Sequence, residues 1–452
     1  MNTTLESTTA SLRDEHAQCD SEKGGAVDTI RPQSDTIPEH PKADGADQVG
    51  EYPEGGLRAW SVLLGVWIVQ FCTFGYTNAY GVYNDFYVRV YLAEKYTSWI
   101  GSTQLLLVLS IGLFSGRAFD TGYFYHLMIG GSLLFVFCIF MVSLSQPGQY
   151  YQLFLAQGLG IGTAVGITYV PGVSILSHYF HRRRALAMGI AVSGSGVGGA
   201  IHPIILNQLF HGPVGFHNGV RASGGLVGGL LIIAILLMKP RLPPTSRKLG
   251  STLEDLRIFL RDPPYVIMVV GTVLVFAGLY FPIFFLQLNA IKNGIDPSLA
   301  FYTLVILNGA STVGRVLPNL LVARLGVFNV MVPSVFISGV LVFCILGLKN
   351  AAGTIVFAVL YGFFSGAYAS LLSPMIASLA KKDTEIGARL GICFTFTGLG
   401  GLVGTPIAGA LLSKDFVWWR PSLFAAICVL TGALCFSLTR MLVARRKETS
   451  WL

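Results

Sequence analysis

The stretch RLPPTSRKLGSTLEDLRIFLRD, from Arg241 to Asp262, decides the fold, because it divides an apolar chain into two similar parts. It is charged, broken by two prolines and longer than the other connections between apolar segments. Six apolar segments precede it and six follow it. Each is long enough for a helix to cross the hydrocarbon core of a bilayer, which takes about 20 residues. We therefore predict an all-α membrane protein made of two six-helix halves.

The predicted spans are separated by polar connections. The twelve spans are 58–83, 98–118, 125–145, 150–175, 185–207, 221–239, 264–288, 299–321, 329–348, 351–378, 388–411 and 421–443. The predicted regions are a disordered acidic tail, an N-terminal half, a central loop, a C-terminal half and a short tail, at 1–55, 56–239, 240–263, 264–443 and 444–452. The first tail is predicted to be disordered because it is rich in Asp, Glu, Ser, Thr and Pro and poor in aromatic residues.

The composition excludes a water-soluble protein. Of the 452 residues, 53% are hydrophobic and only 12% are charged, whereas soluble domains carry about 25% charged residues. The net charge of +8 does not indicate a nucleic-acid binder, because the bases lie in short runs between apolar segments. The first 55 residues lack the apolar core of a cleavable signal peptide, so we expect the first span to act as the insertion signal.

The distribution of basic residues predicts the orientation. Outside the first tail, the even-numbered connections and the C-terminal segment hold eighteen Lys and Arg residues, and the odd-numbered connections hold seven. Cytosolic connections carry the excess of positive charge in membrane proteins. Both termini are therefore predicted to be cytosolic, as are the two tails and the central loop.

Two spans are similar enough to indicate an internal repeat. Span five reads RRRALAMGIAVSGSGVGG from Arg182, and span eleven reads GARLGICFTFTGLGGLVG from Gly387. At an offset of 202 residues four glycines coincide, with Gly189, Gly196, Gly198 and Gly199 on Gly391, Gly398, Gly400 and Gly401. Internal repeats are common in transporters, so the match favours a duplicated six-helix unit.

Three stretches resemble the monocarboxylate porter family of the major facilitator superfamily. PEGGLRAW, from Pro53, is similar to the family's first signature, acidic-Gly-Gly-x-x-x-Trp. QGLGIGTAVGITYVPGVSILSHYF, from Gln157, runs into HRRRALAMGIAVSGSGVGG and resembles the second signature, tyrosine–aromatic–basic run–Leu-Ala-x-Gly. EIGARLGICFTFTGLGGLVGTPIAGAL, from Glu385, resembles the fungal branch. The resemblance covers about residues 50–445 and implies a transporter whose halves rock around a central cavity.

The resemblance also implies conformational roles. Gly116 and Asp120 resemble the superfamily's cytosolic hinge motif, in which the acid pairs with a basic residue of a neighbouring loop. Arg117 departs from the usual basic position of that motif, and a solvated loop acid is the alternative for Asp120. Basic and glycine residues at the start of spans five and eleven are predicted to act in gating: Arg182, Arg183, Arg184, Gly189 and Arg389.

Arg315 is the basic residue that lies deepest inside a predicted span, in LNGASTVGRVLPNLLVARLG. A charged group within the membrane is costly, so such residues usually line a cavity and bind something. The guanidinium presents a planar fork that fits a carboxylate, and the position resembles the family's substrate-carboxylate arginine. We predict that Arg315 binds the substrate. A structural ion pair or a carbonyl cap between helices is the alternative.

Two positions depart from the animal branch of the family. There an acid stands one turn before the arginine, and a lysine in span one accepts the transported proton; here the matching positions hold Ser311 and Val82. Asp85, one turn beyond Val82, is the remaining candidate for a proton site. A solvated helix end is the alternative for Asp85.

Other polar and aromatic residues within the spans are predicted to line the cavity. They are Tyr76, Asn78, Gln104, Tyr169 and His202 in the first half and Gln287, Asn308, Tyr361 and Tyr368 in the second. Such groups in a mostly apolar cavity suit an amphipathic organic anion. For His202, a hydrogen-bonded helix residue is the alternative.

The functional prediction is a secondary active or facilitative carrier of a small organic anion, such as a monocarboxylate. An efflux carrier for a secondary metabolite, or an importer of a non-acidic nutrient, is the alternative, and a membrane sensor is a remote one. The sequence holds no HExxH motif, no GxSxG motif and no metal-spaced Cys/His cluster, so we expect no enzyme, metal or cofactor. The expected partners are a small solute and the lipid bilayer, without nucleic acid or an obligate protein, and the expected location is the plasma membrane, with an organelle membrane as the alternative.

Overall fold

Helices make up every regular element in the described part of this computed structural model, which comprises residues 53–87, 94–241, 252–380, 386–412 and 416–447. The first half contains α1 (Gly56–Cys72), α2 (Phe74–Asn78), α3 (Tyr80–Phe86), α4 (Glu94–Ser110), α5 (Gly112–Asp120), α6 (Phe124–Val142), α7 (Tyr150–Leu153), the π-helix η2 (Phe154–Ile161), α8 (Gly162–Ser174), the 3₁₀-helix η3 (Ile175–His178), α9 (Arg184–His211) and α10 (Gly215–Leu237). The remainder contains α11 (Thr252–Phe259), α12 (Pro263–Lys292), α13 (Pro297–Leu325), α14 (Val327–Cys344), the 3₁₀-helix η4 (Ile345–Gly347), α15 (Ala351–Ser378), α16 (Ile386–Leu412) and α17 (Trp419–Lys447).

Twelve helical segments of the described chain are long and apolar enough to cross a membrane, which confirms the predicted number of spans. Their bounds agree closely with the predicted ones. The largest difference is at span six, which was predicted from 221 but begins at Gly215. The chain reverses there within a few residues, because Gly215 has a φ of 70°, a conformation that favours glycine.

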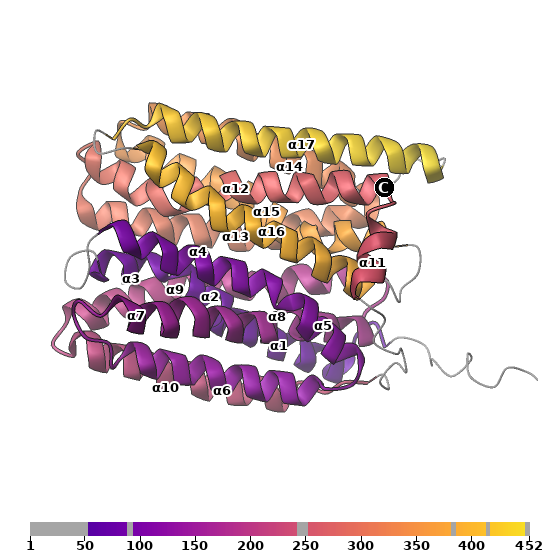
Figure 1. Ribbon diagram of the computed structural model, residues 1–452, viewed down its shortest axis with the longest axis horizontal. Coiled ribbons are helices and arrows are strands. Elements are labelled where there is room, and N and C mark those ends of the chain that lie inside the picture. Colours follow the sequence, from indigo (N-terminus) through magenta and orange to yellow (C-terminus); the bar gives the residue numbers. More distant parts are fainter. Residues whose placement is uncertain (1–52, 88–93, 242–251, 381–385, 413–415, 448–452) are drawn as a thin grey trace, which may run out of the picture. The chain divides into compact units, whose positions relative to one another are not determined.

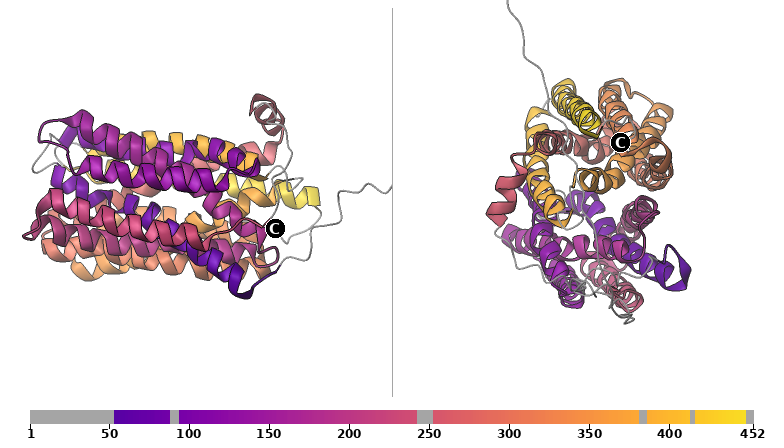
Figure 2. Two further views of the ribbon diagram at one scale, coloured as in Figure 1. Left: turned by 90° about the horizontal axis from the view of Figure 1, so that it is seen from below. Right: turned by 90° about the vertical axis from the view of Figure 1, so that its right-hand side faces the viewer.

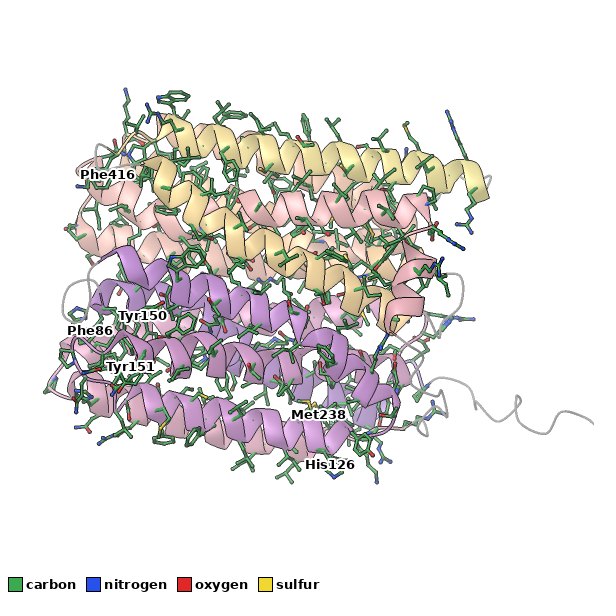
Figure 3. All side chains as sticks on the ribbon, in the orientation of Figure 1. Phe86, His126, Tyr150, Tyr151, Met238 and Phe416 are labelled. Carbon is green, nitrogen blue, oxygen red and sulfur yellow. The ribbon has the colours of Figure 1, made fainter. Side chains whose placement is uncertain are left out.

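The spans alternate in direction along the bundle. Figure 3 shows Phe86, Tyr150 and Phe416 near one end and His126 and Met238 near the other. These residues lie at or next to the ends of spans, so successive connections change ends as a polytopic chain requires. Most of the first and last tails and part of the central loop lie outside the described residues, and their cytosolic location stays a prediction.

The long helices of each half group together and the two groups face each other. In Figure 1 the first half, from indigo to magenta, lies below the second half, from salmon to yellow, and the end-on view in Figure 2 shows the same grouping. Between the halves, α9 packs against α13, and α4 and α5 pack against α16. The predicted domain bounds follow this grouping but stay a prediction.

Two of the four repeated glycine pairs lie clearly where the halves meet. Gly189 and Gly196 of α9 face α13, and a methyl group at Gly189 would lie 2.7 Å from the backbone oxygen of Arg315. At the paired positions, Gly391 and Gly398 of α16 face α5 and α4 in the same way. Small residues let membrane helices approach closely. The contacts therefore give the predicted repeat a physical basis, because matched glycines make the two interfaces between the halves.

The outer faces of the bundle are apolar. Leu133, Ile232, Leu236 and Leu434 belong to three different spans, and each is more than half exposed. A water-soluble surface this rich in exposed large apolar residues would aggregate, whereas lipid accepts it. The outer surface therefore agrees with a protein that lies within a bilayer.

The first span is broken twice, between α1 and α2 and between α2 and α3. The Thr73 hydroxyl donates a hydrogen bond to the Val69 carbonyl at 2.7 Å, and the Thr77 hydroxyl donates to the Thr73 carbonyl at 3.1 Å. Threonine side chains that bond back to the preceding turn bend helices. Transporters use interrupted helices near their substrate sites, and the breaks flank residues of the cavity described next.

Candidate functional site

A cavity of about 70 Å³ lies between the two halves. Helices α1, α2, α4, α8 and α9 of the first half and α12, α13, α15 and α16 of the second contribute to its wall. The lining residues are Gln70, Phe74, Asn78, Leu109, Tyr169, Val192, Ser195, Phe276, Leu279, Tyr280, Arg315, Tyr368, Ala369, Leu372 and Phe394. Sites for organic ligands usually measure about 300–1,000 Å³, so a metabolite needs the halves to move apart before it fits.

Arg315 lies on α13 at this cavity and is only 8% exposed. Its Nη1 donates to the Val192 carbonyl at 3.1 Å and to the Ser195 hydroxyl, both on α9 of the opposite half. Its Nε–H has no hydrogen-bond partner among the described residues. The guanidinium therefore bridges the two halves and keeps one donor for a ligand. Arg315 thus lies at the cavity wall, and its role in substrate binding stays a prediction.

Two further polar side chains of the cavity wall lack partners. Gln70, on α1, is 0% exposed, and neither Nε2 nor Oε1 makes a hydrogen bond within the described structure. The hydroxyl of Tyr368, on α15, is likewise unpartnered, and the residue is 1% exposed. An unsatisfied buried polar group costs about 1–3 kcal/mol. Tyr368 was predicted from the sequence, but Gln70 was missed, although an amide in the middle of an apolar span was a visible signal.

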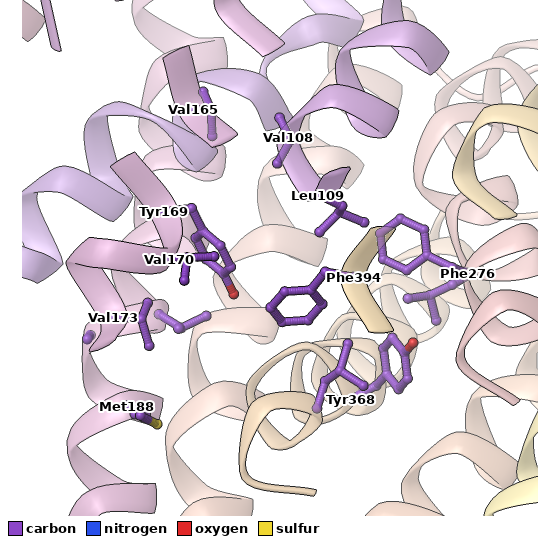
Figure 4. Packing of buried hydrophobic residues seen from close by; sticks show 14 of the residues in the cluster. Val108, Leu109, Val165, Tyr169, Val170, Val173, Met188, Phe276, Tyr368 and Phe394 are labelled. Carbon is purple, nitrogen blue, oxygen red and sulfur yellow. The ribbon is translucent and has the colours of Figure 1, made fainter. Parts of the chain in front are cut away.

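Aromatic rings form a large part of the remaining wall. The rings of Tyr169 and Tyr368 lie on either side of Phe394, with Phe276 nearby (Figure 4). The centroid of the Tyr169 ring is 6.1 Å from that of Phe394 and 4.9 Å from that of Phe74. Aromatic rings favour stacked or edge contacts with other rings, so this wall suits a ligand with a flat conjugated frame. Tyr169 therefore lies where the sequence predicted it.

Asn78 and Gln104 reach a second, smaller cavity of about 10 Å³. Asn78 lines both cavities, and its Nδ2 donates to the Ser195 carbonyl at 3.4 Å. Gln104 lines only the smaller one and donates from Nε2 to the Thr77 hydroxyl at 3.2 Å. Asn78 is therefore part of the main cavity wall, whereas Gln104 lines only the smaller cavity.

Tyr76 and His202 lie outside both cavities, contrary to the prediction. The Tyr76 hydroxyl bonds to the hydroxyls of Tyr83 and Ser223 inside the first half. The His202 Nε2 atom lies 3.1 Å from the Phe71 carbonyl oxygen and bonds to it. Both side chains face the interior of one half because their polar atoms are satisfied there. For His202 this is the alternative of a hydrogen-bonded helix residue.

Asn308 and Tyr361 also lie outside both cavities. The Asn308 side chain donates to the Leu304 carbonyl at 3.0 Å and packs against Gly199 of α9. The Tyr361 hydroxyl donates to the Leu279 carbonyl at 2.6 Å inside the second half. Asn308 therefore belongs to the interface between the halves, and Tyr361 serves packing within one half. Each residue lies on a face of its helix that points away from the cavities. The sequence alone does not fix which face of a helix meets a cavity.

Glu54, in the first signature PEGGLRAW, holds the start of α9. The Glu54 carboxylate accepts hydrogen bonds from the backbone N–H groups of His181 at 2.8 Å, Arg182 at 2.5 Å and Arg183 at 3.2 Å. The side chains of Arg182 and Arg183 themselves are exposed. A carboxylate at free backbone N–H groups before a helix is a favourable cap. The basic run thus contributes its backbone to the contact with Glu54, and the gating role of Arg182, Arg183 and Arg184 stays a prediction.

The Glu54 contact is expected to depend on pH. Partial burial raises the pKa of the Glu54 carboxyl, but the three backbone N–H groups outweigh it and hold the pKa below the ordinary 4.5. A group with a lowered pKa contributes stability above its unfolded pKa and loses it as pH falls through the folded value. We expect Glu54→Gln to lower the free energy of unfolding at pH 7 by no more than about 1 kcal/mol, and so to lower the heat-unfolding midpoint slightly.

The gap between wild type and Glu54→Gln is expected to close as pH falls below 4.5. Thermal unfolding of the detergent-purified protein, followed by size exclusion from pH 7 to about pH 3, measures this gap, because the loss occurs as pH falls through the lowered pKa. A gap that is constant over this range would show that ionisation of Glu54 is not what holds α9.

A corresponding contact holds the start of α16 in the second half. Asp262 precedes α12, and its Oδ2 lies 2.9 Å from Nη1 of Arg389 at the start of α16. Arg389 is 2% exposed, and its guanidinium lies over the rings of Phe259 and Tyr265 at 4.6 and 5.0 Å. Arg446 approaches the other carboxylate oxygen at 3.5 Å. In each half, an acid before the first span therefore holds the start of the fifth span of that half.

The hinge-motif residues lie between the halves. Gly116 packs on α8, where an added methyl group would lie 3.1 Å from Val170. Asp120 reaches the start of α16, with Oδ2 3.2 Å from the position of a methyl group at Gly387. An acid near a helix N-terminus is favourable. The neighbouring loop 381–385 lies outside the described residues, so the predicted pairing of Asp120 with a basic loop residue stays a prediction.

The role of Asp85 in proton coupling stays a prediction. The backbone of Asp85 belongs to α3, but its side chain lies outside the described part. Val82, where the animal branch has a lysine, is buried. In the described part of the chain, no group of three or more His, Cys, Asp or Glu side chains is placed to hold a metal ion.

Known proteins give a consistent comparison. The profile of the Major Facilitator Superfamily matches residues 66–328 and 268–452. The MFS-type transporter dbaD of Emericella nidulans is 41% identical over 366 residues, which cover 80% of this chain and 81% of that protein. The aspyridones efflux protein apdF of the same organism is 35% identical, over 89% of this chain and 82% of that protein. The agnestins efflux protein of Paecilomyces divaricatus is 35% identical, over 85% and 88%.

Among solved structures, the human organic anion transporter MFSD10 (TETRAN) superposes with a TM-score of 0.62. The alignment covers 84% of this chain and 97% of that one, at 15% identity. At this low identity the likeness shows the fold alone. It confirms the predicted arrangement of twelve helices.

Proposed function

This chain belongs to the major facilitator superfamily of membrane transporters, and from that premise we propose that it exports a conjugated organic anion of the secondary-metabolite class. The observation that carries the proposal is a buried arginine with a free donor in a cavity walled by aromatic rings. Arg315 offers charge to an acidic group. The rings of Tyr169, Phe276 and Phe394 offer stacking surface to a flat frame.

The names of the relatives support the direction of transport. Two proteins that are 35% identical to this chain over most of its length are named as efflux proteins for aspyridones and agnestins. Neither name fixes the substrate of this chain. Export across the plasma membrane is the simplest route by which a carrier of this kind removes a metabolite from a cell.

Arg315 connects substrate binding to the movement of the halves. Its guanidinium binds α9 through the Val192 carbonyl and the Ser195 hydroxyl. An anionic group that takes over these donors removes two hydrogen bonds between the halves. Because a ligand shifts an equilibrium only by its different affinity for the two states, this exchange gives the substrate a way to favour separation of α9 and α13.

A monocarboxylate such as lactate is a poorer match. Its carboxylate suits Arg315, but its small apolar part leaves the aromatic wall and the amide of Gln70 without contacts. The signature resemblance fixes the scaffold and leaves the substrate open. The prediction of an efflux carrier for a secondary metabolite, given as the alternative from the sequence, therefore fits the site better than the first prediction.

Counterflow into proteoliposomes tests the substrate class. Vesicles that contain the full chain are preloaded with unlabelled 2-naphthoate, and uptake of labelled 2-naphthoate is compared with uptake of labelled lactate under matched loading. We expect 2-naphthoate to exchange at least about fivefold faster, because stacking adds binding energy of about 1 kcal/mol or more. Exchange of lactate without exchange of 2-naphthoate would overturn the proposal in favour of a monocarboxylate carrier.

The direction of transport is tested in cells. Deletion of the gene in its own organism is expected to raise the ratio of intracellular to secreted conjugated acids. Restoration of the intact chain should return this ratio to its original value. A lower intracellular level after deletion would indicate an importer.

A further inference from the structure

Gln70 is a polar group that the fold places in the cavity and leaves without a partner. It lies four residues before Phe74 and eight before Asn78, and these three residues share one face of the broken first span and line the same cavity. The residue is 0% exposed, yet neither of its amide atoms is hydrogen-bonded within the described structure. Buried polar groups are hydrogen-bonded in the great majority of cases, so the absence of a hydrogen-bond partner for this amide requires an explanation.

Other buried glutamines of the same half differ from Gln70 in this respect. Gln157 accepts a hydrogen bond from the Tyr87 hydroxyl at 2.6 Å, and Gln104 donates to the Thr77 hydroxyl at 3.2 Å. Each holds neighbouring helices together, as a structural amide does. Gln70 makes no such contact, although Phe71 beside it uses its backbone carbonyl to bind His202. Its amide is therefore available to a ligand.

The chemistry of the amide indicates the partner. A glutamine side chain presents a donor at Nε2 and an acceptor at Oε1. A hydroxyl satisfies both atoms, because it accepts from Nε2 and donates to Oε1. The unpartnered hydroxyl of Tyr368, from the opposite half, lines the same cavity and can add a further bond.

We infer that Gln70 binds a hydroxyl group on the conjugated frame of the substrate and so selects hydroxylated aromatic acids over their unhydroxylated analogues. The inference rests on the proposed function, since it assumes an organic anion held at Arg315. It narrows the substrate class to flat acids with a phenolic or enolic hydroxyl. A site built to bind a hydroxyl discriminates strongly against an analogue that lacks it, because its own polar groups are then left unpaired.

Matched naphthoates test this role. The Kd values of 2-naphthoate and of its 1-hydroxy, 3-hydroxy and 6-hydroxy derivatives are measured by calorimetry with the full chain in detergent micelles. We expect the wild type to bind at least one hydroxy derivative about tenfold more tightly than 2-naphthoate. Gln70→Leu should reduce this ratio to about 1, because it removes the hydrogen bonds to the hydroxyl group.

Several results separate the outcomes. Binding of 2-naphthoate by Gln70→Leu shows that the variant is folded. Gln157→Leu, which removes a buried amide that pairs with Tyr87, should keep the wild-type ratio. Equal Kd values of all four acids for the wild type, or a preference that survives Gln70→Leu, would overturn the inference and leave the proposed function standing. Failure of the wild type to bind any of the four acids would instead overturn the proposed function and this inference with it.

Discussion

Arg315→Ala is expected to lower counterflow of 2-naphthoate by about 10- to 100-fold. The substitution removes a charge-assisted contact to the anion, worth about 1.5–3 kcal/mol, and about 2.8 kcal/mol corresponds to a 100-fold change. It also removes the hydrogen bonds to Val192 and Ser195 that join α13 to α9. Counterflow and calorimetric binding of 2-naphthoate measure the two effects separately.

Two variants sharpen the test of Arg315. Arg315→Lys keeps the charge but loses the planar fork, so we expect transport between that of the wild type and that of Arg315→Ala. Arg324→Ala removes an exposed arginine from the last turn of the same helix and should leave transport unchanged. Wild-type binding of 2-naphthoate by Arg315→Ala would show that the guanidinium serves the interface between the halves and not the substrate.

The number and bounds of the spans could be predicted because hydropathy within a bilayer is a local property of the sequence. Arg315 could be identified as a candidate site residue for a related reason, because a charge inside an apolar span is rare whatever the tertiary structure. Neither argument depends on knowing which helices are neighbours. Both predictions therefore agree with the structure.

The cavity wall could not be predicted in the same way. A helix that is apolar on all sides gives no periodic signal for the face that meets the cavity. Tyr76 and Asn78 are two residues apart, yet Tyr76 points into the first half and Asn78 reaches the cavity. Gln70 shares the face of Asn78, but its lack of a partner becomes visible only when the neighbouring helices are in place.

Glu54 and Asp262 are the acids that precede the two halves. Their contacts could not be predicted from the sequence, for a different reason. Glu54 binds backbone N–H groups, and a backbone donor has no signature in the sequence. Asp262 and Arg389 are 127 residues apart, so no local pattern joins them. Their equivalence appears only in the fold, where each acid lies at the start of its half and reaches the fifth span of that half.

Arg389→Met is expected to destabilise the protein by about 3–5 kcal/mol, the usual effect of removing one partner from a buried ion pair. The variant leaves the Asp262 carboxylate, 9% exposed, with Arg446 at 3.5 Å. It also removes the guanidinium from the faces of Phe259 and Tyr265. The midpoint of heat unfolding, measured by fluorescence size exclusion, should fall by roughly 5–10 °C.

The double variant Asp262→Leu with Arg389→Met distinguishes a lost contact from a stranded charge. Replacing both partners of a buried pair by apolar residues is often neutral or stabilising, so we expect the double variant to recover much of the midpoint lost in Arg389→Met. Arg446→Met should have a small effect, because Arg446 is 49% exposed. If the double variant is as unstable as Arg389→Met alone, the loss comes from the cation–ring packing of Arg389 and not from the uncompensated carboxylate. If Arg389→Met unfolds at the wild-type midpoint, the contact between α12 and α16 does not stabilise the second half.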